Sequence, residues 1–375
     1  MSRAITKSTT IVRQCILFLL YLSQGAVAGL VGATLPLVLK RHVSYRLVGL
    51  LSIAFYPYSL KILWSPIIDA TGKSRRRIWI AVSLVISGLG LLIMALCLPT
   101  FIRSLVQSRT SAIFLFVAFL LLIVLASATQ GAAADGWALT VFPPTQLQYV
   151  SVIHNLGMVL EQFGTYAGYL WLSAATIVDH QPSERLLREL VFFWSVGILF
   201  IVLPGVLAMT DGSEVPQCRP IRSHYKKAIS LLRLDPVQTI IVIHLLSGIP
   251  FEAHDSATNL KLLELGLKEA YLAFVSAIDL VFDILATYIT SLLCARIEPM
   301  RLWCWAYVCR IFAVVMSEVI FSTYSSKNSL SLPMVILEHI CSTSTATIMF
   351  VSFLTLHLRV SDPEFGSTYM TLLAT

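Results

Sequence analysis

Charged residues are scarce in this sequence of 375 residues. Asp, Glu, Lys and Arg make up 13% of it, whereas a soluble globular domain contains about 25%. Hydrophobic residues make up 57%, so the chain lacks the polar side chains that would cover a water-exposed surface. The composition therefore excludes an ordinary soluble domain.

Sequence signatures of catalysis and of metal binding are also missing. The chain has no G-x-S-x-G, no H-E-x-x-H, no P-loop and no zinc-ligand spacing. Its seven cysteines are scattered without a C-x-x-C pair, which predicts buried thiols. We therefore expect no catalytic residue, no metal site and no cofactor. The net charge of +7 fits basic cytosolic loops, and we do not expect nucleic-acid binding.

Apolar runs that are long enough to cross a bilayer recur from end to end. A helix of about 20 apolar residues spans about 30 Å of hydrocarbon, and in lipid the backbone must satisfy its own hydrogen bonds. The sequence predicts an all-α, multi-pass membrane protein. Its spans, about ten in number, are predicted at residues 14–38, 46–69, 77–99, 111–141, 147–178, 188–210, 236–258, 267–294, 301–323 and 331–358.

A polar connection at residues 211–235 divides the chain after the sixth predicted span. We expect an N-terminal six-helix half over 1–210, a cytosolic linker over 211–235 and a C-terminal half over 236–375. The last of these holds four predicted spans and the start of a fifth. Lys and Arg outside the spans are more numerous on the side of the amino terminus and the linker, which predicts a cytosolic amino terminus.

Lys61 lies in the middle of the second predicted span, within "YSLKILWSPIIDA" (58–70). A charge at the centre of a bilayer costs at least about 2.5–3.5 kcal/mol, so such a residue normally faces a partner or a water-filled pathway. Two interpretations stay open. Lys61 either reaches the interface or a carboxylate on another helix, or it is a fixed positive charge that contacts an anion in a pathway.

Asp69 ends the same span, and Arg75, Arg76 and Arg77 follow it after a short turn. This charge pattern resembles the loop between the second and third spans in the major facilitator superfamily. There the acid and the arginines latch neighbouring helices on the cytosolic side. The resemblance implies that Asp69, Arg75 and Arg76 form such a latch, and simple positive-inside topology is the alternative.

Other polar residues also fall inside predicted spans. They are Gln130, Asp135, Trp137, Asn155, Glu161, Glu252, His254, Asp255, Asp279, Asp283, Arg310, Glu318, Glu338 and His339, and Lys261 follows just after the seventh span. For any one of them a structural contact is an alternative to a role in transport, but the set favours a hydrated cavity. Pro250 predicts a broken or kinked seventh helix. Gly25, Gly29 and Gly32 predict close helix packing.

Four segments together resemble the acetyl-coenzyme A transporter family of endoplasmic reticulum membranes. They are "YSLKILWSPIIDA" (58–70), "ATQGAAADGWALT" (128–140), "AHDSATNLKL" (253–262) and "VSDPEFGSTYMTLLAT" (360–375), and they run in order along almost the whole chain. That family belongs to the major facilitator superfamily and is distantly related to the muropeptide permeases. The resemblance implies a twelve-span fold that works by alternating access. It also implies an antiporter that exchanges cytosolic acetyl-CoA for luminal CoA.

The resemblance also implies a set of residues along the substrate pathway. They are Lys61, Trp64, Gln130, Asp135, Trp137, Asp255 and Arg310. Coenzyme A carries several phosphate charges, and the cations Lys61 and Arg310 can offset the loss of their hydration. The implied partners are acetyl-CoA, CoA and the lipid bilayer, and a homo-oligomer stays open.

The chain departs from the family pattern at several places. Gly131 stands where the family usually has an acid, and Met158 and Glu161 stand where small or amide residues are usual. About ten of the twelve implied spans are present, so we expect a truncated sequence. Three alternatives stay open: a permease for another small anionic solute, a non-transporting membrane protein, and a membrane acetyltransferase that depends on His254.

Overall fold

In a computed structural model of the chain, every regular element in the described part is helical. The structure describes residues 2–39, 43, 45–107, 110–169, 183–209, 220–264, 269–323 and 331–374. Within these ranges seven helices are long and apolar enough to cross a membrane. The bent pair Ile221–Leu232 and Asp235–Phe251 makes an eighth if it counts as one span. The prediction of an all-α, multi-pass membrane protein is confirmed.

The described residues form two compact units. The first unit comprises Met1–Pro143, Leu156–Ala228 and Ser361–Thr375, and the second comprises Pro144–Asn155 and Ile229–Val360. These bounds differ from the expected halves at two places. Residues 144–155 belong to the second unit, and residues 361–375 belong to the first because α17 packs on α7 and α5.

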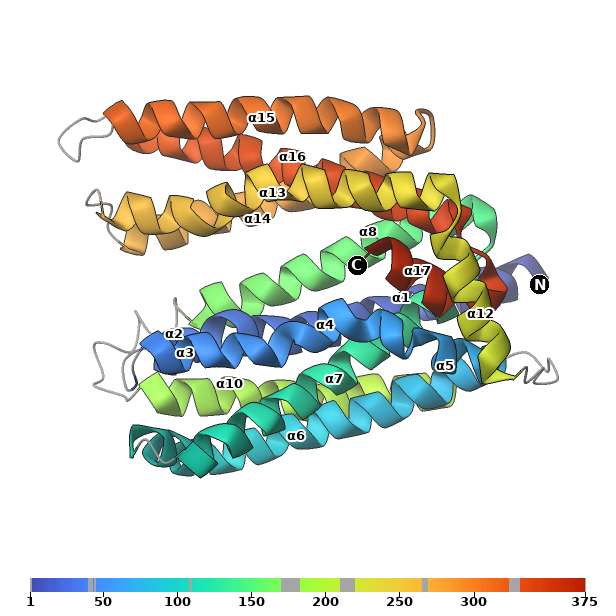
Figure 1. Cartoon of the computed structure of the whole chain (residues 1–375), viewed down its shortest axis with the longest axis horizontal. Coiled ribbons are helices and arrows are strands. Elements are labelled where there is room, and N and C mark those ends of the chain that lie inside the picture. Colours follow the sequence, from blue (N-terminus) through green and yellow to red (C-terminus); the bar gives the residue numbers. More distant parts are fainter. Residues whose placement is uncertain are drawn as a thin grey trace. The chain divides into compact units, whose positions relative to one another are not determined.

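The first unit is built from long helices joined by short helical turns. Its elements are α1 (Ser2–Gly29), η1 (Leu30–Thr34), α2 (Leu35–Leu39), α3 (Tyr45–Leu51), η2 (Ser52–Phe55), α4 (Tyr56–Leu60), η3 (Lys61–Leu63), α5 (Ser65–Ala70), η4 (Lys73–Arg75), α6 (Arg76–Val106), α7 (Thr110–Val141), η6 (Phe163–Ala167), α10 (Ser183–Gly197), η8 (Ile198–Val202), α11 (Leu203–Ala208), η9 (Pro363–Phe365) and α17 (Gly366–Ala374). Figure 1 shows α6 and α7 side by side, and α10 packs against α6.

The second predicted span, 46–69, is a chain of short helices and not one continuous helix. Pro57 lies in the first turn of α4 and Pro66 in the first turn of α5. A proline is accepted there because the first N–H groups of a helix have no intrahelical partner. Each proline therefore starts a new short helix, and the tighter turns η2 and η3 precede them. Lys61 is the first residue of η3.

The second unit contains four long helices. They are α13 (Asp235–Glu264), α14 (Glu269–Cys294), α15 (Pro299–Thr323) and α16 (Ser331–Val360). Helix α16 packs against both α14 and α15 (Figure 1). A core of Phe251, Trp303, Ala306, Met349 and Phe353 joins α13, α15 and α16.

Helix α13 runs without a break through Pro250, so the seventh helix is not broken there, and the kink that was the other possibility stays a prediction. Pro250 is exposed, whereas the next residue, Phe251, is buried in the core of the unit. This packing on one face holds the helix together, and membrane helices tolerate a proline when their surroundings satisfy the freed backbone groups.

Two helices have residues in both units. Helix α8 (Leu147–Gln162), preceded by η5 (Pro144–Gln146), begins in the second unit and ends in the first. Helix α12 (Ile221–Leu232) begins in the first unit, within the expected linker, and ends in the second. The predicted span 147–178 is helical through η6, and its residues from 170 onward lie outside the described ranges.

Gly157 lets α8 approach α1 closely within the first unit. A Cβ atom at this position would lie 2.8 Å from the Cβ of Tyr21 and 3.0 Å from the backbone nitrogen of Leu22. The first distance is too short for two carbon atoms, and the second is tight against a backbone atom, which cannot move without moving the helix. The absence of a side chain at Gly157 is therefore what allows the two helices to touch.

We expect Gly157→Ala to lower the free energy of unfolding by about 1–3 kcal/mol, the usual cost of overpacking a filled interface. The matched control is Gly248→Ala, because Gly248 also lies inside an α-helix and an added Cβ there meets nothing within 4 Å. Both changes add the same helix propensity, so their difference isolates the clash. Thermal unfolding of the purified protein in detergent, followed by tryptophan fluorescence, measures it. Equal unfolding midpoints for the two variants would contradict the close approach of α1 and α8.

Candidate functional site

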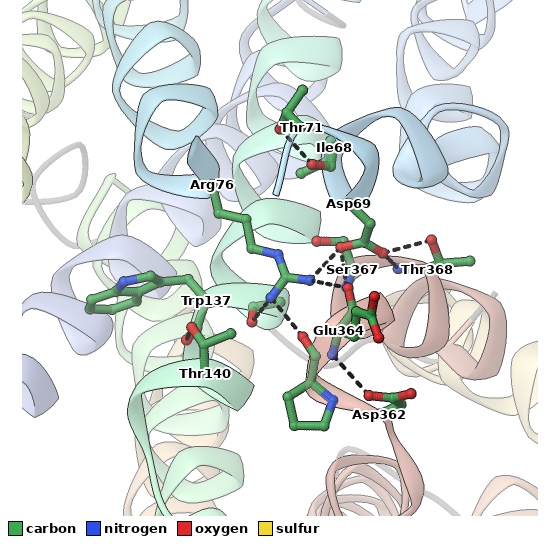
Figure 2. Close-up of polar contacts among 12 residues, drawn as sticks. Ile68, Asp69, Thr71, Arg76, Trp137, Thr140, Asp362, Glu364, Ser367 and Thr368 are labelled. Atoms are coloured by element: carbon green, nitrogen blue, oxygen red, sulfur yellow. Dashed lines mark hydrogen bonds and ion pairs between the residues drawn. The ribbon is translucent and has the colours of Figure 1, made fainter. Parts of the chain in front are cut away.

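A buried ion pair lies where α5 ends and α6 begins (Figure 2). Nη2 of Arg76 lies 2.6 Å from Oδ1 of Asp69, and both side chains are completely buried. Gly72 makes the turn between them with a φ of 90°, a conformation that suits glycine because it has no Cβ. The sequence "DATGKSRR" thus folds the chain back so that the acid and the arginine meet.

The guanidinium of Arg76 joins three segments of the first unit. Nη1 donates to the carbonyl oxygen of Gly136 at 2.7 Å and to that of Pro363 at 3.0 Å. Nη2 donates to the carbonyl oxygen of Glu364 at 3.1 Å in addition to its bond with Asp69. The planar fork of arginine can serve several acceptors at once, which the single ammonium of a lysine cannot do in the same plane.

The carboxylate of Asp69 caps the beginning of α17. Oδ2 accepts hydrogen bonds from the backbone nitrogen of Thr368 at 2.8 Å and from its hydroxyl at 2.7 Å. Oδ1 accepts from the backbone nitrogen of Ser367 at 3.2 Å, as Figure 2 shows. The first N–H groups of a helix lack intrahelical partners and carry partial positive charge, so a carboxylate there is stabilised. Asp69 therefore binds α17 to α5 through backbone groups.

Helix α12 reaches the same segment from the expected linker. Nζ of Lys227 lies 3.9 Å from the centre of the Phe365 ring and 3.7 Å from a carboxylate oxygen of Asp362. Tyr225 of the same helix donates a hydrogen bond to the carbonyl oxygen of Leu63. The linker helix is thus fixed to both the short helices after Lys61 and the loop before α17.

The structure brings together two of the three predicted latch residues. Asp69 and Arg76 form the pair, whereas Arg75 is exposed at the end of η4. Nothing in the sequence indicates that Ser367 and Thr368 meet Asp69, because they contribute mainly backbone N–H groups from almost 300 residues away. The segment "DPEFGST", a proline followed by small capping residues, signals only the helix start that is predicted there.

Lys61 lies between two aromatic residues that are bound to α7. The hydroxyl groups of Tyr58 and Ser127 lie 2.9 Å apart, and Nε1 of Trp64 donates to the hydroxyl of Thr129 at 3.0 Å. Lys61 itself is partly buried, and its ammonium group has no hydrogen bond or ion pair with any residue that the structure describes. No described carboxylate neutralises it, which leaves both the interface and the anion-contact interpretations open.

Gln130 and Asp135 connect α7 to α1. Nε2 of Gln130 donates to the carbonyl oxygen of Leu20 at 2.8 Å and to the hydroxyl of Ser23 at 2.9 Å. The hydroxyl of Tyr21 donates to Oδ1 of Asp135 at 2.7 Å. Both side chains are buried, and these contacts fit the helix-packing alternative.

Gly131 of α7 also lies at the interface with α1. A Cβ at Gly131 would lie 2.7 Å from both polar atoms of the Gln24 side chain. A side chain at this position would therefore displace the end of the Gln24 side chain. Trp137 is also buried, and its Nε1 has no hydrogen-bond partner among the described residues.

His254 is the centre of a polar cluster in the second unit. Its Nε2 lies 3.3 Å from Oε1 of Glu338 on α16, and Ser317 of α15 and Ser342 of α16 lie within 3.3 Å of its ring nitrogens. A similar pair joins Nδ1 of His339 to Oδ2 of Asp279 at 3.1 Å. These contacts join all four long helices of the unit in pairs.

The two predicted pathway residues of the second unit lie on different helices. The guanidinium carbon of Arg310 on α15 lies 4.5 Å from the centre of the Phe251 ring of α13. Asp255 belongs to α13, but its side chain lies outside the described residues. In the described part of the chain no group of three or more metal-ligand side chains occurs, and the six cysteines found there are free.

Solved transporter structures share this fold. The human organic anion transporter TETRAN matches with a TM-score of 0.66 and 13% identity over 96% of this chain and 89% of that chain. The Escherichia coli fucose:proton symporter FucP, a major facilitator superfamily transporter, has a TM-score of 0.64 and 14% identity over 96% and 88%. At these identities the likeness shows the fold alone. The chain is thus a multi-pass membrane protein with the fold of that superfamily.

Two fungal proteins and one family profile match this sequence. An uncharacterized protein of Schizosaccharomyces pombe is 30% identical over 370 residues, which cover 96% of this chain and 70% of that protein. An uncharacterized membrane protein of Saccharomyces cerevisiae is 28% identical over 96% of this chain and 80% of its own length. The profile of the family described as acetyl-coenzyme A transporter 1 matches residues 14–211, 205–301 and 288–375. The chain belongs to this family, and the predicted resemblance is confirmed.

We expect Asp69→Asn to lower the free energy of unfolding by about 3–5 kcal/mol, because it leaves the buried guanidinium of Arg76 without a counter-charge. Arg75→Gln is the control, since this arginine lies in the same turn but is exposed. The measurement is the thermal unfolding midpoint in detergent. A double-mutant cycle with Arg76→Gln gives the coupling between the two charges. The buried pair would be refuted if Asp69→Asn and Arg75→Gln were equally stable.

Proposed function

We propose that this protein transports acetyl-CoA from the cytosol into the lumen of the endoplasmic reticulum in exchange for CoA. Membership of the acetyl-coenzyme A transporter 1 family and the transporter fold support the proposal. The proposed function moves the substrate without a chemical step, so it needs no catalytic residue and no cofactor. The cytosolic amino terminus and linker are part of the same proposal.

The observation that carries the proposal is the position of Lys61. It is a partly buried ammonium without an ion-pair partner in the described residues, and Tyr58 and Trp64 on either side are held by α7. Phosphate groups lose strong hydration when they leave water, and a nearby cation offsets that cost. An unneutralised cation in this position fits the phosphates of coenzyme A, and we assign Lys61 to the substrate pathway.

Arg310 is the second cation that we assign to the pathway. It is partly buried on α15, and its contact with the Phe251 ring holds the guanidinium plane. A guanidinium binds phosphate through two parallel hydrogen bonds, so Arg310 and Lys61 offer different kinds of anion contact. We assign Gln130 and Asp135 to the packing of α1 on α7, and they support the pathway indirectly.

We further propose that Asp69 and Arg76 act as a latch during alternating access. Their hydrogen bonds hold α5, α6, α7 and α17 together through groups that meet only when all four segments are in place. A transporter must open and close around its substrate, and a charged pair that depends on helix positions can be made in one state and broken in another.

A permease for another small anionic solute is the second candidate, because an unpaired lysine attracts any anion. Competition separates the two candidates. In the proposed exchanger, excess unlabelled CoA and acetyl-CoA inhibit uptake, whereas phosphorylated sugars and peptidoglycan fragments do not. An acetyltransferase centred on His254 would instead release acetylated product, and the contacts of His254 with Glu338, Ser317 and Ser342 also fit a role in joining helices.

The decisive experiment is uptake of labelled acetyl-CoA into proteoliposomes that hold the full chain, with and without CoA inside. Uptake that rises with internal CoA supports an exchanger. No uptake by protein that is shown to be folded and inserted would refute transport of acetyl-CoA by this chain. The same vesicles with labelled sugar phosphate test the second candidate.

We expect Lys61→Gln to raise the KM for acetyl-CoA about tenfold or more, because a charge-assisted hydrogen bond contributes about 1.5–3 kcal/mol. Lys73→Gln is the matched control, since Lys73 is exposed in the turn before α6. Initial rates of uptake over a range of substrate concentrations give KM and maximal rate separately. An unchanged KM for Lys61→Gln, or an equal rise for Lys73→Gln, would show that Lys61 does not contact the substrate.

A further inference from the structure

Glu161, at the end of α8, is a buried acid that the proposed substrate pathway does not use. Its exposed fraction is 0%, and it lies in the first unit. Neither of its carboxyl oxygens has a hydrogen-bond partner among the described residues. Buried carboxylates are normally paired or hydrogen-bonded, so an acid with neither needs an explanation.

Two glycines of α1 form the space that holds this carboxyl group. A Cβ at Gly25 would lie 3.2 Å from the Cβ of Glu161 and 3.3 Å from its Oε2. A Cβ at Gly29 would lie 3.3 Å from the same Oε2 and only 2.2 Å from the hydroxyl oxygen of Thr165. The close packing that the glycine spacing predicted is therefore confirmed here. The glycines leave room for an acid and supply no side chain to pair with it.

Both helices change their winding at this point. The π-helical turn η1 begins directly after Gly29, and the π-helical turn η6 begins directly after α8. The two turns pack together. Such turns inside α-helices are often found at functional sites, because the wider ring perturbs regular backbone bonding. They set the helical segments around Glu161 apart from regular α-helix.

The hydroxyl groups beside the acid are already committed to the backbone. The hydroxyl of Thr165 donates its one proton to the backbone carbonyl oxygen of Glu161 at 2.9 Å. The hydroxyl of Thr34 donates to the carbonyl oxygen of Gly29 at 3.2 Å. The Thr165 hydroxyl therefore offers the carboxyl group of Glu161 only a shared proton.

The titratable groups on the neighbouring elements are also engaged or neutral. Tyr21 of α1 donates to Asp135 of α7, so this carboxylate has its own partner. Tyr58 of α4, which is close enough to interact electrostatically with Glu161, shares a hydrogen bond with Ser127 of α7. Lys61 of η3, one turn after Tyr58, makes no ion pair with any described residue. An ionised Glu161 would thus be an unpaired charge away from water, and the neutral acid is favoured in this arrangement.

We propose that Glu161 binds and releases a proton during the transport cycle, so that a proton gradient can drive the exchange. An O–H bond forms on the carboxylate when it takes a proton from water on one side. That bond breaks, and the proton returns to water, when the segment opens on the other side. This inference rests on the proposed transport function and adds a coupling ion to it.

The test uses proteoliposomes that hold the full chain and a pH-sensitive dye. We expect the parent protein to take up acetyl-CoA faster under a pH gradient and to move protons when substrate is added. Glu161→Gln mimics the neutral acid, so exchange at equal pH should stay within about twofold of the parent. Its response to the pH gradient and its proton movement should be lost. Glu189→Gln, which changes an exposed acid of α10, should behave like the parent.

Several results would overturn the proposal while the proposed function stands. One is exchange in the parent with no effect of a pH gradient and no proton movement. Another is a Glu161→Gln variant that keeps the full response, and a third is a response to a sodium gradient in place of the proton gradient. If Glu161→Gln does not fold, Glu161→Asp replaces it. The aspartate variant should keep proton movement with a displaced pH profile, and an unchanged profile would contradict the proposal.

If the parent does not exchange acetyl-CoA, infrared spectroscopy of the folded protein still tests the site. A protonated carboxylic acid has a carbonyl band that a carboxylate lacks. We expect such a band near neutral pH in the parent and in Glu189→Gln. We expect its loss in Glu161→Gln, which has no carboxyl group at this position. The absence of that band from the parent would refute the proton site independently of any transport measurement.

Discussion

The first unit depends on the ion pair between Asp69 and Arg76. Two charges that are completely buried cost more in lost hydration than their attraction returns, unless further hydrogen bonds satisfy them. Here the arginine takes three backbone carbonyl oxygens, and the aspartate takes two N–H groups from the first turn of α17. The pair is therefore stable only when α5, α6, α7 and α17 are assembled together, which is what a conformational latch requires.

The polar residues inside the first and second units fall into two groups. Some have hydrogen-bond or ion-pair partners on neighbouring helices, and others, to which we assign functions, lack such a partner in the described part of the chain. Gln130, Asp135 and His254 each have at least one partner on a neighbouring helix, and in a membrane such contacts hold helices together. Lys61 and Glu161 have charge or acidity without an ion-pair partner in the described residues. An isolated charge is costly in lipid. This cost is why we propose an anion contact for Lys61 and proton binding for Glu161.

Much of the fold could be predicted from the lengths of the apolar runs. The helices at 76–106, 110–141, 299–323 and 331–360 match predicted spans because a bilayer sets one length for every crossing. The same reasoning could not foresee that the second span is a series of short helices started by Pro57 and Pro66, nor that α13 continues through Pro250. A proline forbids one hydrogen bond, but neighbouring segments decide whether the helix survives its loss.

The sequence by itself determined the class of protein, the family and the presence of an acid and arginines around a tight turn, because these follow from composition and from residues close together in the chain. The tertiary structure decided that Arg76, and not Arg75, enters the pair. It also decided that Ser367 and Thr368 complete the pair, and that Gly25 and Gly29 enclose Glu161. These outcomes depend on which groups from distant segments share one small volume. Partners of that kind, often backbone atoms, leave no pattern in a single sequence.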